Sequence, residues 1–597
     1  MAITNTTAAA AQHGPLYGIQ LLADGSVASG LLMSLVSMVV LAAIFGLAGA
    51  LGSGGGGGGG DKQPPSLWEP IPFVYNSLQF LLDNEGFMKR AQAALKKTTV
   101  ARFRQGGHLV YLVSGPKNVQ AVFGRSHNNN IHNDDLMVRS TLPLWYRLSA
   151  DDLRRFATDK TGRGRNPLPG TEDTPPENRL FLGYEHVHNE FLARAQHLAP
   201  MVEQYQRQLT QTLDGLCPSP SDATGTGKKG RNDDGVVLGV VDFCKGRVAR
   251  CALHALLGPG AFEISPDLVE RMWEFDDAVF PLVMGLRLGV PEWLNRRAHA
   301  AHRRYLNAVR RYLDAAWADF DWADPASADA RWEPRFGAQV TREVAKWFRD
   351  HGFTGPDTGP GAVGILAWAQ NSNVIPTTTW LVMEVARDPE LLRALREEVE
   401  TAFATDGATG RRRTLDPQKV AALPLLASAY TETLRLRMNF NVVRNVRQSF
   451  TMAGYTIRGG SLLQVPTLVA HYDEDVWGAE SHPASEFWAG RHIKYTDEPD
   501  AEGRVTRKRV FAMASRTGSY FPYGGGNLIC PGRHFAKQEI MLTIALLISR
   551  FDIEFLGWTK LDGSPSDRPP RNDPRFSGGG AAPPDRDMKI RIRPIAS

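Results

Sequence analysis

A glycine-rich loop that holds one cysteine and leads into an apolar helix constrains this chain more than any other segment. The loop covers residues 521–535, FPYGGGNLICPGRHF, and a helix is expected from about 535 to 551. The N–H groups and the positive dipole end of that helix point back toward Cys530, and both stabilise a thiolate. Glycines let a flat, bulky group approach the backbone, and Gly532 leaves space beside the sulfur. The loop therefore predicts a metal-ligating thiolate rather than an inert buried thiol.

The spacing of this loop resembles the haem-binding signature of the cytochrome P-450 superfamily. Tyr523, Gly526, Cys530 and Gly532 occupy the positions of that signature. The resemblance implies haem b as the cofactor and Cys530 as its axial iron ligand, an arrangement that favours O–O cleavage. Two residues depart from the common pattern: Tyr523 replaces a Phe, and Leu528 replaces a basic residue that usually contacts a haem propionate.

A second signal is a glutamate and an arginine three residues apart, about a hundred residues before the cysteine. Glu432 and Arg435 share a helix face and can pair. The resemblance implies a buried structural triad with Arg491, although the proline that usually precedes that arginine is missing. A solvated surface pair is the alternative.

A third signal is the apolar segment 362–380, which predicts a long buried helix with Pro376 inside it. Proline cannot donate to the carbonyl of Ser372, so we expect a kink and a polar pocket beside Asn373. The resemblance implies that Asn373 and the Ser372 carbonyl order a catalytic water. A kinked core helix without chemistry is the alternative.

Ser372 and Asn373 stand where most superfamily members have an acid followed by Thr. This pattern is similar to a narrower group, the bile-acid sterol hydroxylases and prostacyclin synthase with their fungal relatives. The resemblance covers roughly residues 65 to 595. It implies Arg444 as a propionate contact, and it implies substrate contacts from Trp368, Asn439, Val442 and Gly579. Trp145 lies where a helix over the haem face could begin.

The expected organisation is a mainly helical cytochrome P-450 fold with a smaller β-rich lobe, preceded by one transmembrane helix. The uncharged stretch 27–51 is long enough to span a bilayer, and Lys and Arg follow it. This predicts a lumenal segment 1–26, a Gly/Pro-rich linker 52–65 and a catalytic domain 66–597 on the cytosolic side of the endoplasmic reticulum membrane. Residues 218–235 predict a disordered insertion.

The implied function is a monooxygenase that hydroxylates or oxidises a sterol, a terpenoid or another lipophilic metabolite, in a fungal biosynthetic setting. No flavin or nicotinamide site is visible, so electrons from NADPH would arrive through a separate NADPH-cytochrome reductase. A net charge of +5 with mixed signs gives no indication of nucleic-acid binding. Two alternatives stay open: a prostacyclin-synthase-like isomerase of a peroxide that needs neither oxygen nor NADPH, and a non-enzymatic haem carrier.

Overall fold

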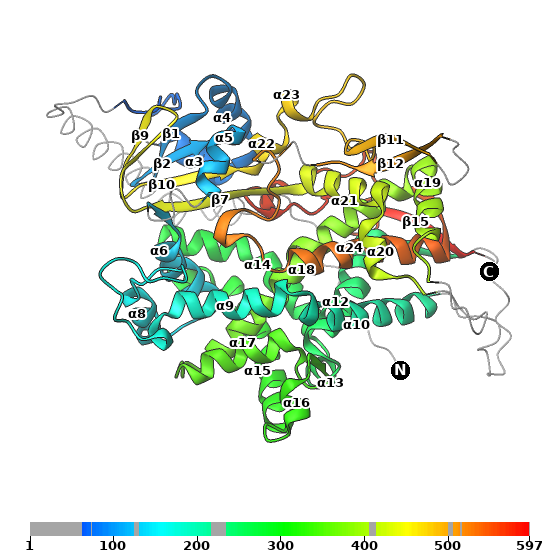
Figure 1. Ribbon diagram of the computed structural model, residues 1–597, viewed down its shortest axis with the longest axis horizontal. Helices are drawn as coiled ribbons and strands as arrows, with labels where there is room; N and C mark the ends of the chain where they lie inside the picture. Colours follow the sequence, from blue (N-terminus) through cyan, green and yellow to red (C-terminus); the bar gives the residue numbers. More distant parts are fainter. Residues whose placement is uncertain are drawn as a thin grey trace, which may run out of the picture.

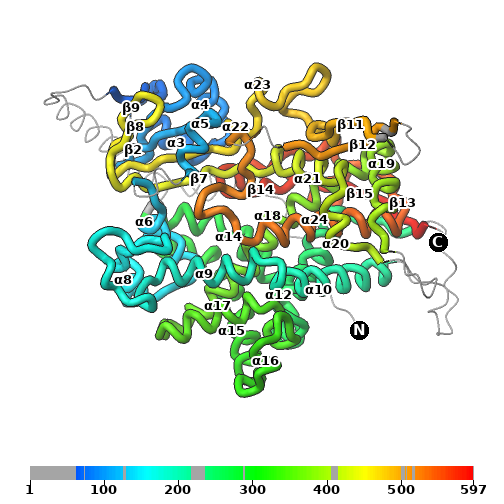
Figure 2. The backbone as a smooth tube through the Cα atoms, in the orientation of Figure 1, coloured from blue at the N-terminus to red at the C-terminus, as the bar shows by residue number. Residues whose placement is uncertain are grey.

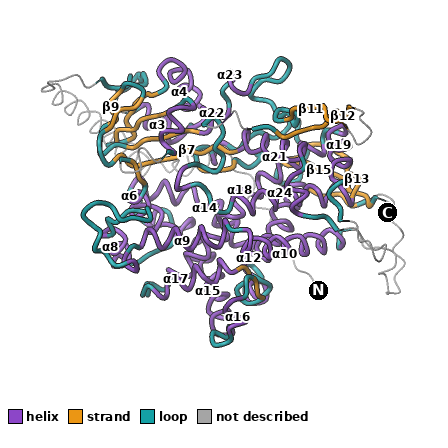
Figure 3. The backbone as a smooth tube through the Cα atoms, viewed as in Figure 1, coloured by secondary structure: helices purple, strands orange, loops and turns teal. Residues whose placement is uncertain are grey.

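Helices make up most of the molecule; the main sheet lies in a smaller lobe at one end, and further strands lie near helices at the other end (Figures 1 and 3). The computed structural model describes residues 62–595, apart from residues 73, 125–129, 217–234, 405–413, 500–504, 514, 515 and 517. The mainly helical fold with a smaller β-rich lobe agrees with the prediction from the sequence. The predicted segment 1–26, residues 52–61 of the linker and residues 218–234 of the insertion lie outside the described residues.

The predicted membrane anchor requires a correction. Within the part of the chain that the structure describes, no helix is long and apolar enough to cross a bilayer. The predicted span 27–51 itself lies outside the described residues. The finding goes against the single-pass helix and the endoplasmic reticulum membrane placement, and neither is retained.

The β-rich lobe is built on a sheet with the strand order β1-β2-β10-β7-β14, and β3 pairs with β7 as well. Its strands are β1 (Val100–Gln105), β2 (His108–Val113), β3 (Ile131–His132), β7 (Met438–Val446), β10 (Leu462–Pro466) and β14 (Gly579–Ala581). Only the β10–β2 pair is parallel among the described pairs of this sheet. The sheet thus joins residues from both ends of the described chain, and β14 and β7 together border the cavity described below.

The remaining strands form smaller sheets. They are β4 (Val236–Gly239), β5 (Trp332–Glu333), β6 (Gly337–Ala338), β8 (Phe450–Met452), β9 (Tyr455–Ile457), β11 (Ile493–Pro499), β12 (Val505–Phe511), β13 (Phe551–Thr559) and β15 (Asp587–Pro594). The order β13-β15-β4 makes a three-stranded sheet, and the others pair as β5–β6, β8–β9 and β11–β12.

Most of the longer helices form the body of the molecule, and the first three pack on the main sheet. They are α3 (Tyr75–Leu82), α4 (Asn84–Thr98), α5 (Pro116–Phe123), α8 (Ala150–Thr158), α9 (Leu180–Ala193), α10 (Ala195–Asp214), α12 (Ala249–Leu257), α14 (Leu268–Leu288), α15 (Arg296–Asp319), α17 (Gln339–Asp350), α18 (Thr358–Ala386), α19 (Pro389–Glu400), α21 (Pro424–Arg437) and α24 (Arg533–Arg550). Shorter helices that matter below are α7 (Leu142–Trp145), α22 (Thr467–His471) and the 3-10 turn Gly526–Leu528.

Helices α18 and α24 run through the middle of the molecule and contact each other (Figure 2). Both are apolar around most of their circumference, which is the pattern of a helix buried on all sides. The hydroxyls of Thr377, Thr378 and Thr379 donate to carbonyls four residues earlier at 2.7–2.8 Å, so these buried polar groups are satisfied. The helix is unbroken across Pro376. These two helices carry the cysteine loop and Asn373.

Candidate haem site

The cysteine loop folds back on itself just before α24. The Cys530 N–H donates to the Tyr523 carbonyl at 3.0 Å, and the Arg533 guanidinium donates to the Cys530 carbonyl at 2.8 Å. Helix α24 begins at Arg533, so its first N–H groups lie next to the sulfur as predicted. The half-buried Cys530 borders a cavity of about 710 Å³. That volume is within the usual range of roughly 300–1,000 Å³ for a ligand or cofactor site.

The glycines of this loop serve two different purposes. Gly526 has φ +70°, and a Cβ there would come within 2.7 Å of the Phe123 carbonyl oxygen. A Cβ at Gly525 would overlap the Phe123 ring. These two glycines are therefore needed for packing against α5. At Gly532 the nearest atom to an added Cβ is Cys530 Sγ at 3.9 Å, so the expected space beside the sulfur is present.

The electrostatics of Cys530 are a balance between burial and the helix start. Burial raises the pKa of the thiol above its ordinary value, while the N–H groups of Gly532 and Arg533 and the Arg533 charge act in the opposite direction. Burial prevails, so the pKa of the thiol lies above its ordinary value in the protein without the cofactor. A metal ion bound at the sulfur would supply the missing stabilisation, because a coordinating thiol is deprotonated.

Arg444 is the cationic group that best suits a haem propionate. It borders the cavity and donates to the carbonyls of Val443 and Gly525 at 2.9 and 3.3 Å. Among the described residues it forms no ion pair within 4 Å, and burial lowers its pKa to about 10. A half-buried guanidinium that has Glu185 nearby but no carboxylate within ion-pair distance among the described residues fits an anionic cofactor group at this edge of the cavity. Leu528 borders the cavity as well, at the position where a basic residue was expected.

Tyr523 also borders the cavity, and its hydroxyl lies 2.5 Å from the hydroxyl of Tyr430 on α21. This hydrogen bond ties the cysteine loop to the helix behind it. Burial raises the pKa of both phenols, so they remain neutral.

Asn373 borders the cavity from α18, but its amide is already partly engaged. Its Oδ1 accepts a hydrogen bond from the Ala581 N–H at 2.9 Å, and its Nδ2 lies 3.3 Å from the Ser372 hydroxyl. A Cβ at Gly580 would lie 2.5 Å from Asn373 Oδ1, so only glycine permits this approach of β14. The Ser372 side chain is not part of the cavity lining. Asn373 therefore holds β14 against α18, and only its Nδ2 remains available to a ligand.

The predicted substrate contacts divide into two groups. Trp368, Val442 and Gly579 border the cavity, whereas Asn439 does not. The Asn439 Nδ2 instead donates to the Ser577 hydroxyl at 2.9 Å. A substrate contact from Asn439 therefore stays a prediction.

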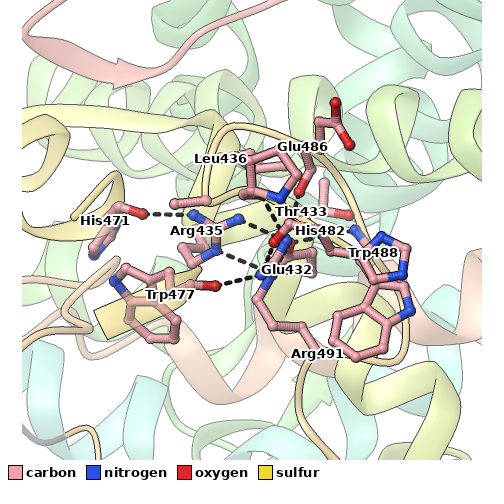
Figure 4. Close-up of polar contacts among 12 residues, drawn as sticks. Glu432, Thr433, Arg435, Leu436, His471, Trp477, His482, Glu486, Trp488 and Arg491 are labelled. Atoms are coloured by element: carbon pink, nitrogen blue, oxygen red, sulfur yellow. Dashed lines mark hydrogen bonds and ion pairs between the residues drawn. The ribbon is translucent and has the colours of Figure 1, made fainter. Parts of the chain in front are cut away.

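The structure brings Glu432, Arg435 and Arg491 together in a fully buried ionic cluster (Figure 4). Arg435 donates twice to the Glu432 carboxylate at 2.8 Å, and Arg491 Nε donates to Glu432 Oε1 at 2.7 Å. The other donors of both arginines reach backbone carbonyls, including that of His471 at 2.5 Å and that of Glu486 at 2.9 Å. Burial acts to raise the pKa of Glu432, but the contacts with Arg435, His492 and Arg491 outweigh it and lower this pKa to about 2.

Several cavity residues were not predicted from the sequence. They are Asn133, Arg163, Glu185, His188, Asn189 and Gln370. Arg163 forms ion pairs with Asp134 at 2.7 Å and Glu185 at 2.5 Å. Three of the six, Glu185, His188 and Asn189, come from α9, and no local motif distinguishes that helix from an ordinary amphipathic one. Strand alternation and helical spacing from the predicted Val442 and Asn373 could have pointed to neighbours such as Gln370.

Comparisons with known proteins agree with the fold and the site. The cytochrome P-450 family model matches residues 362–565. The cytochrome P-450 monooxygenase calL of Penicillium decumbens is 39% identical over 530 residues, which covers 89% of this chain and 92% of the relative. The monooxygenase fsoE of Humicola fuscoatra is 27% identical and covers 89% and 88%. The human 7-alpha-hydroxycholest-4-en-3-one 12-alpha-hydroxylase is 31% identical over 38% of this chain and 44% of its own length.

A solved structure, the retinoic acid-bound cyanobacterial CYP120A1, has a TM-score of 0.57 at 13% identity, and the match covers 90% of this chain and 100% of that one. This likeness concerns the fold alone. A helical haem-thiolate fold and a cysteine on a cofactor-sized cavity define the class. The chain belongs to the cytochrome P-450 family: it is a monooxygenase whose cofactor is a haem with cysteine-thiolate-ligated iron. Sterol hydroxylases are among its relatives, as the resemblance predicted.

Proposed function

We propose that this monooxygenase takes electrons from NADPH through a separate NADPH-cytochrome reductase and oxidises a sterol, a terpenoid or a similar lipophilic metabolite. The observation that carries the proposal is that Cys530, Arg444 and Asn373 border one largely apolar cavity. The human sterol hydroxylase supports the sterol part of the substrate class, and the fungal relatives calL and fsoE support the monooxygenase activity.

The residues of this chain would hold the cofactor in a defined way. Cys530 would bind the iron through its sulfur, Arg444 would pair with a propionate, and Tyr523, Gly526 and Gly532 would shape the loop around the sulfur. When bound, the haem supplies the activation of dioxygen at its iron.

Helix α18 supplies further polar groups. Pro376 has no N–H to donate to the Ser372 carbonyl, so this acceptor is left without its helical partner. The Asn373 Nδ2 would donate a hydrogen bond to a water molecule, and the Ser372 carbonyl would accept one from it. Glu432, Arg435 and Arg491 act from behind the site by fixing the position of α21.

The thiolate assignment is tested by the reduced, carbon-monoxide-bound difference spectrum. The wild type should give the red-shifted Soret band of a thiolate ligand, and Cys530→Ala should lose it. Cys244→Ala is the matched control, because that thiol is fully buried away from the cavity and should leave the band unchanged. A folded Cys530→Ala variant that keeps the band would overturn the assignment.

The electron source is tested separately. Product formation from lipophilic substrates should require NADPH, a reductase and oxygen together. Conversion of a lipid peroxide in the absence of all three would overturn the monooxygenase proposal for this substrate class and favour the isomerase alternative. Tight substrate binding without any turnover would favour a haem carrier.

A further inference from the structure

Two tryptophans far apart in the sequence stack on each other and form one aromatic wall of the cavity. Trp145 at the end of α7 and Trp368 on α18 both border the cavity, with ring centroids 5.4 Å apart and planes 19° apart. Phe275 on α14 meets both rings edge-on, at 5.8 Å and at 82° and 68°. Offset-stacked and edge-to-face contacts are the favourable geometries for aromatic pairs. The three rings therefore form a rigid unit.

This unit is supported from behind. Phe275 stacks on Tyr305 at 5.2 Å and 16° and on His302 at 4.7 Å and 23°. The Tyr305 hydroxyl donates to the Gly364 carbonyl at 2.7 Å, which connects α15 to the same helix that carries Trp368. The wall thus has little freedom to move away from the cavity.

Asp276 fixes the orientation of Trp368 within the wall. The Trp368 Nε1–H donates to Asp276 Oδ1 at 2.9 Å, and this is the one hydrogen bond of the Asp276 side chain among the described residues. Asp276 is only 7% exposed and does not border the cavity. The polar edge of the indole is therefore directed into the protein toward α14, and a ligand meets the apolar ring of Trp368.

Besides Trp368, few groups near Asp276 could stabilise a negative charge on its carboxyl. Burial raises its pKa to about 6, while the Trp368 hydrogen bond and the Lys245 charge act in the opposite direction. A buried carboxyl that makes a single hydrogen bond depends on that bond, because an unsatisfied buried acceptor is costly.

We propose that Asp276 is a positioning residue that holds Trp368 parallel to Trp145, and that the resulting wall makes the cavity select planar fused-ring substrates over flexible chains. The inference rests on the proposed function, in which this cavity receives the substrate. A planar ligand can stack on the wall and loses little conformational freedom on binding. A flexible chain of similar apolar surface must give up many rotamers to lie flat there.

The test uses the haem-loaded full chain and three probes: pyrene as the planar ligand, 1-dodecanol as the flexible one, and imidazole as a ligand of the iron that needs no wall. Asp276→Leu should weaken pyrene binding roughly 3- to 10-fold, which corresponds to the usual strength of an aromatic contact. The affinities for 1-dodecanol and imidazole should stay within about twofold. Asp276→Asn retains an acceptor oxygen and should bind all three probes like the wild type.

Trp368→Phe is the second variant, in case Asp276→Leu does not fold. It keeps a ring but removes the N–H, so it should show the same selective loss of pyrene affinity. The matched control is Trp332→Phe, which removes an indole hydrogen bond to the Ala255 carbonyl (2.8 Å) outside the cavity and should leave the affinities for all three probes unchanged.

The stacked tryptophans should also give a near-ultraviolet circular dichroism signal that weakens in Asp276→Leu and persists in Asp276→Asn.

An equal loss of affinity for all three probes, or no loss for pyrene, would overturn the positioning role, as would an Asp276→Asn variant that behaves like Asp276→Leu. The failure of the proposed function is distinguishable from these outcomes. A protein without the thiolate-type band or without NADPH-dependent turnover would still show the dichroism signal and its dependence on Asp276.

Discussion

Glu432 and Glu539 are both completely buried carboxyl groups on helices that contact each other, yet their surroundings are opposite. Glu432 on α21 lies between two arginines, which lower its pKa from 4.5 to about 2. Glu539 on α24 has no cation paired with it among the described residues, and burial raises its pKa from 4.5 to about 8, against a weaker opposite effect of Gln370. Burial alone therefore does not decide whether a carboxyl is charged, because a paired cation reverses its effect.

The two carboxyls also make stability depend on pH in opposite directions. The lowered pKa of Glu432 means that its contribution is present above about pH 4.5 and is lost as the pH falls toward about 2. The raised pKa of Glu539 means that its contribution is complete below about pH 4.5 and is lost as the pH rises toward about 8. The predictions below test each half of this comparison.

The largest effect is expected from Glu432→Gln. The substitution keeps the shape of the side chain but leaves Arg435 and Arg491 buried without their counter-charge. Breaking a buried pair in this way costs about 3–5 kcal/mol of unfolding free energy. Denaturant unfolding of wild type and variant at neutral pH, followed by circular dichroism, measures this loss. An unchanged unfolding midpoint would mean that the carbonyl contacts alone satisfy the arginines.

The next effect is expected from Glu539→Gln, and it depends on pH. Gln is neutral at every pH, so the variant lacks the pH-dependent term of Glu539. The melting temperature of the variant relative to wild type should rise between about pH 4.5 and pH 8 and then level off. The slope corresponds to at most about 1.4 kcal/mol per pH unit. Melting curves of both proteins from pH 5 to pH 9 provide the difference, and a flat difference would show that Glu539 is ionised throughout.

The sequence indicated one of these two sites and not the other, for a physical reason. Glu432 and Arg435 are three residues apart on one helix, so local geometry brings them together, and the family pattern added Arg491. Glu539 lies in an apolar helix beside polar Gln538, where a solvated face is an equally good interpretation. That Glu539 has no cation paired with it among the described residues follows only from the packing of the neighbouring helices.

In the candidate haem site too, contacts between residues close in sequence could be predicted and contacts between distant segments could not. The loop around Cys530 is defined by residues adjacent in sequence, so its spacing could be recognised. The hydrogen bond from Ala581 to Asn373 and the stacking of Trp145 on Trp368 join segments about two hundred residues apart. No local pattern encodes such contacts. The sequence pattern around Pro376 therefore predicted that Asn373 borders the cavity. It did not predict that the Asn373 Oδ1 accepts a hydrogen bond from Ala581 on β14.

A smaller loss is expected from Arg491→Lys, which keeps the charge of the cluster. Arg491 donates to Glu432 and to four backbone carbonyls, those of Trp477, His482, Pro483 and Glu486. Lysine has three donors on a single nitrogen, so some of these carbonyls would be left unsatisfied. We expect a loss of about 1–3 kcal/mol in the same denaturant experiment. A loss as large as that of Glu432→Gln would show that the hydrogen bonds outweigh the charge balance.

The smallest effect is expected from Glu397→Gln on α19, which removes an ion pair in solvent. Glu397 accepts from Arg393 at 2.7 Å, about the same distance as in the buried cluster, but the two side chains are 61% and 70% exposed. Water already solvates both charges, so the loss should stay well under about 1 kcal/mol and should shrink further in high salt. Denaturant unfolding at low and at high ionic strength measures both quantities. If Glu397→Gln destabilised the protein as much as Glu432→Gln does, ion-pair distance rather than burial would set the cost, and the contrast between the paired and the isolated carboxyl would lose its physical basis.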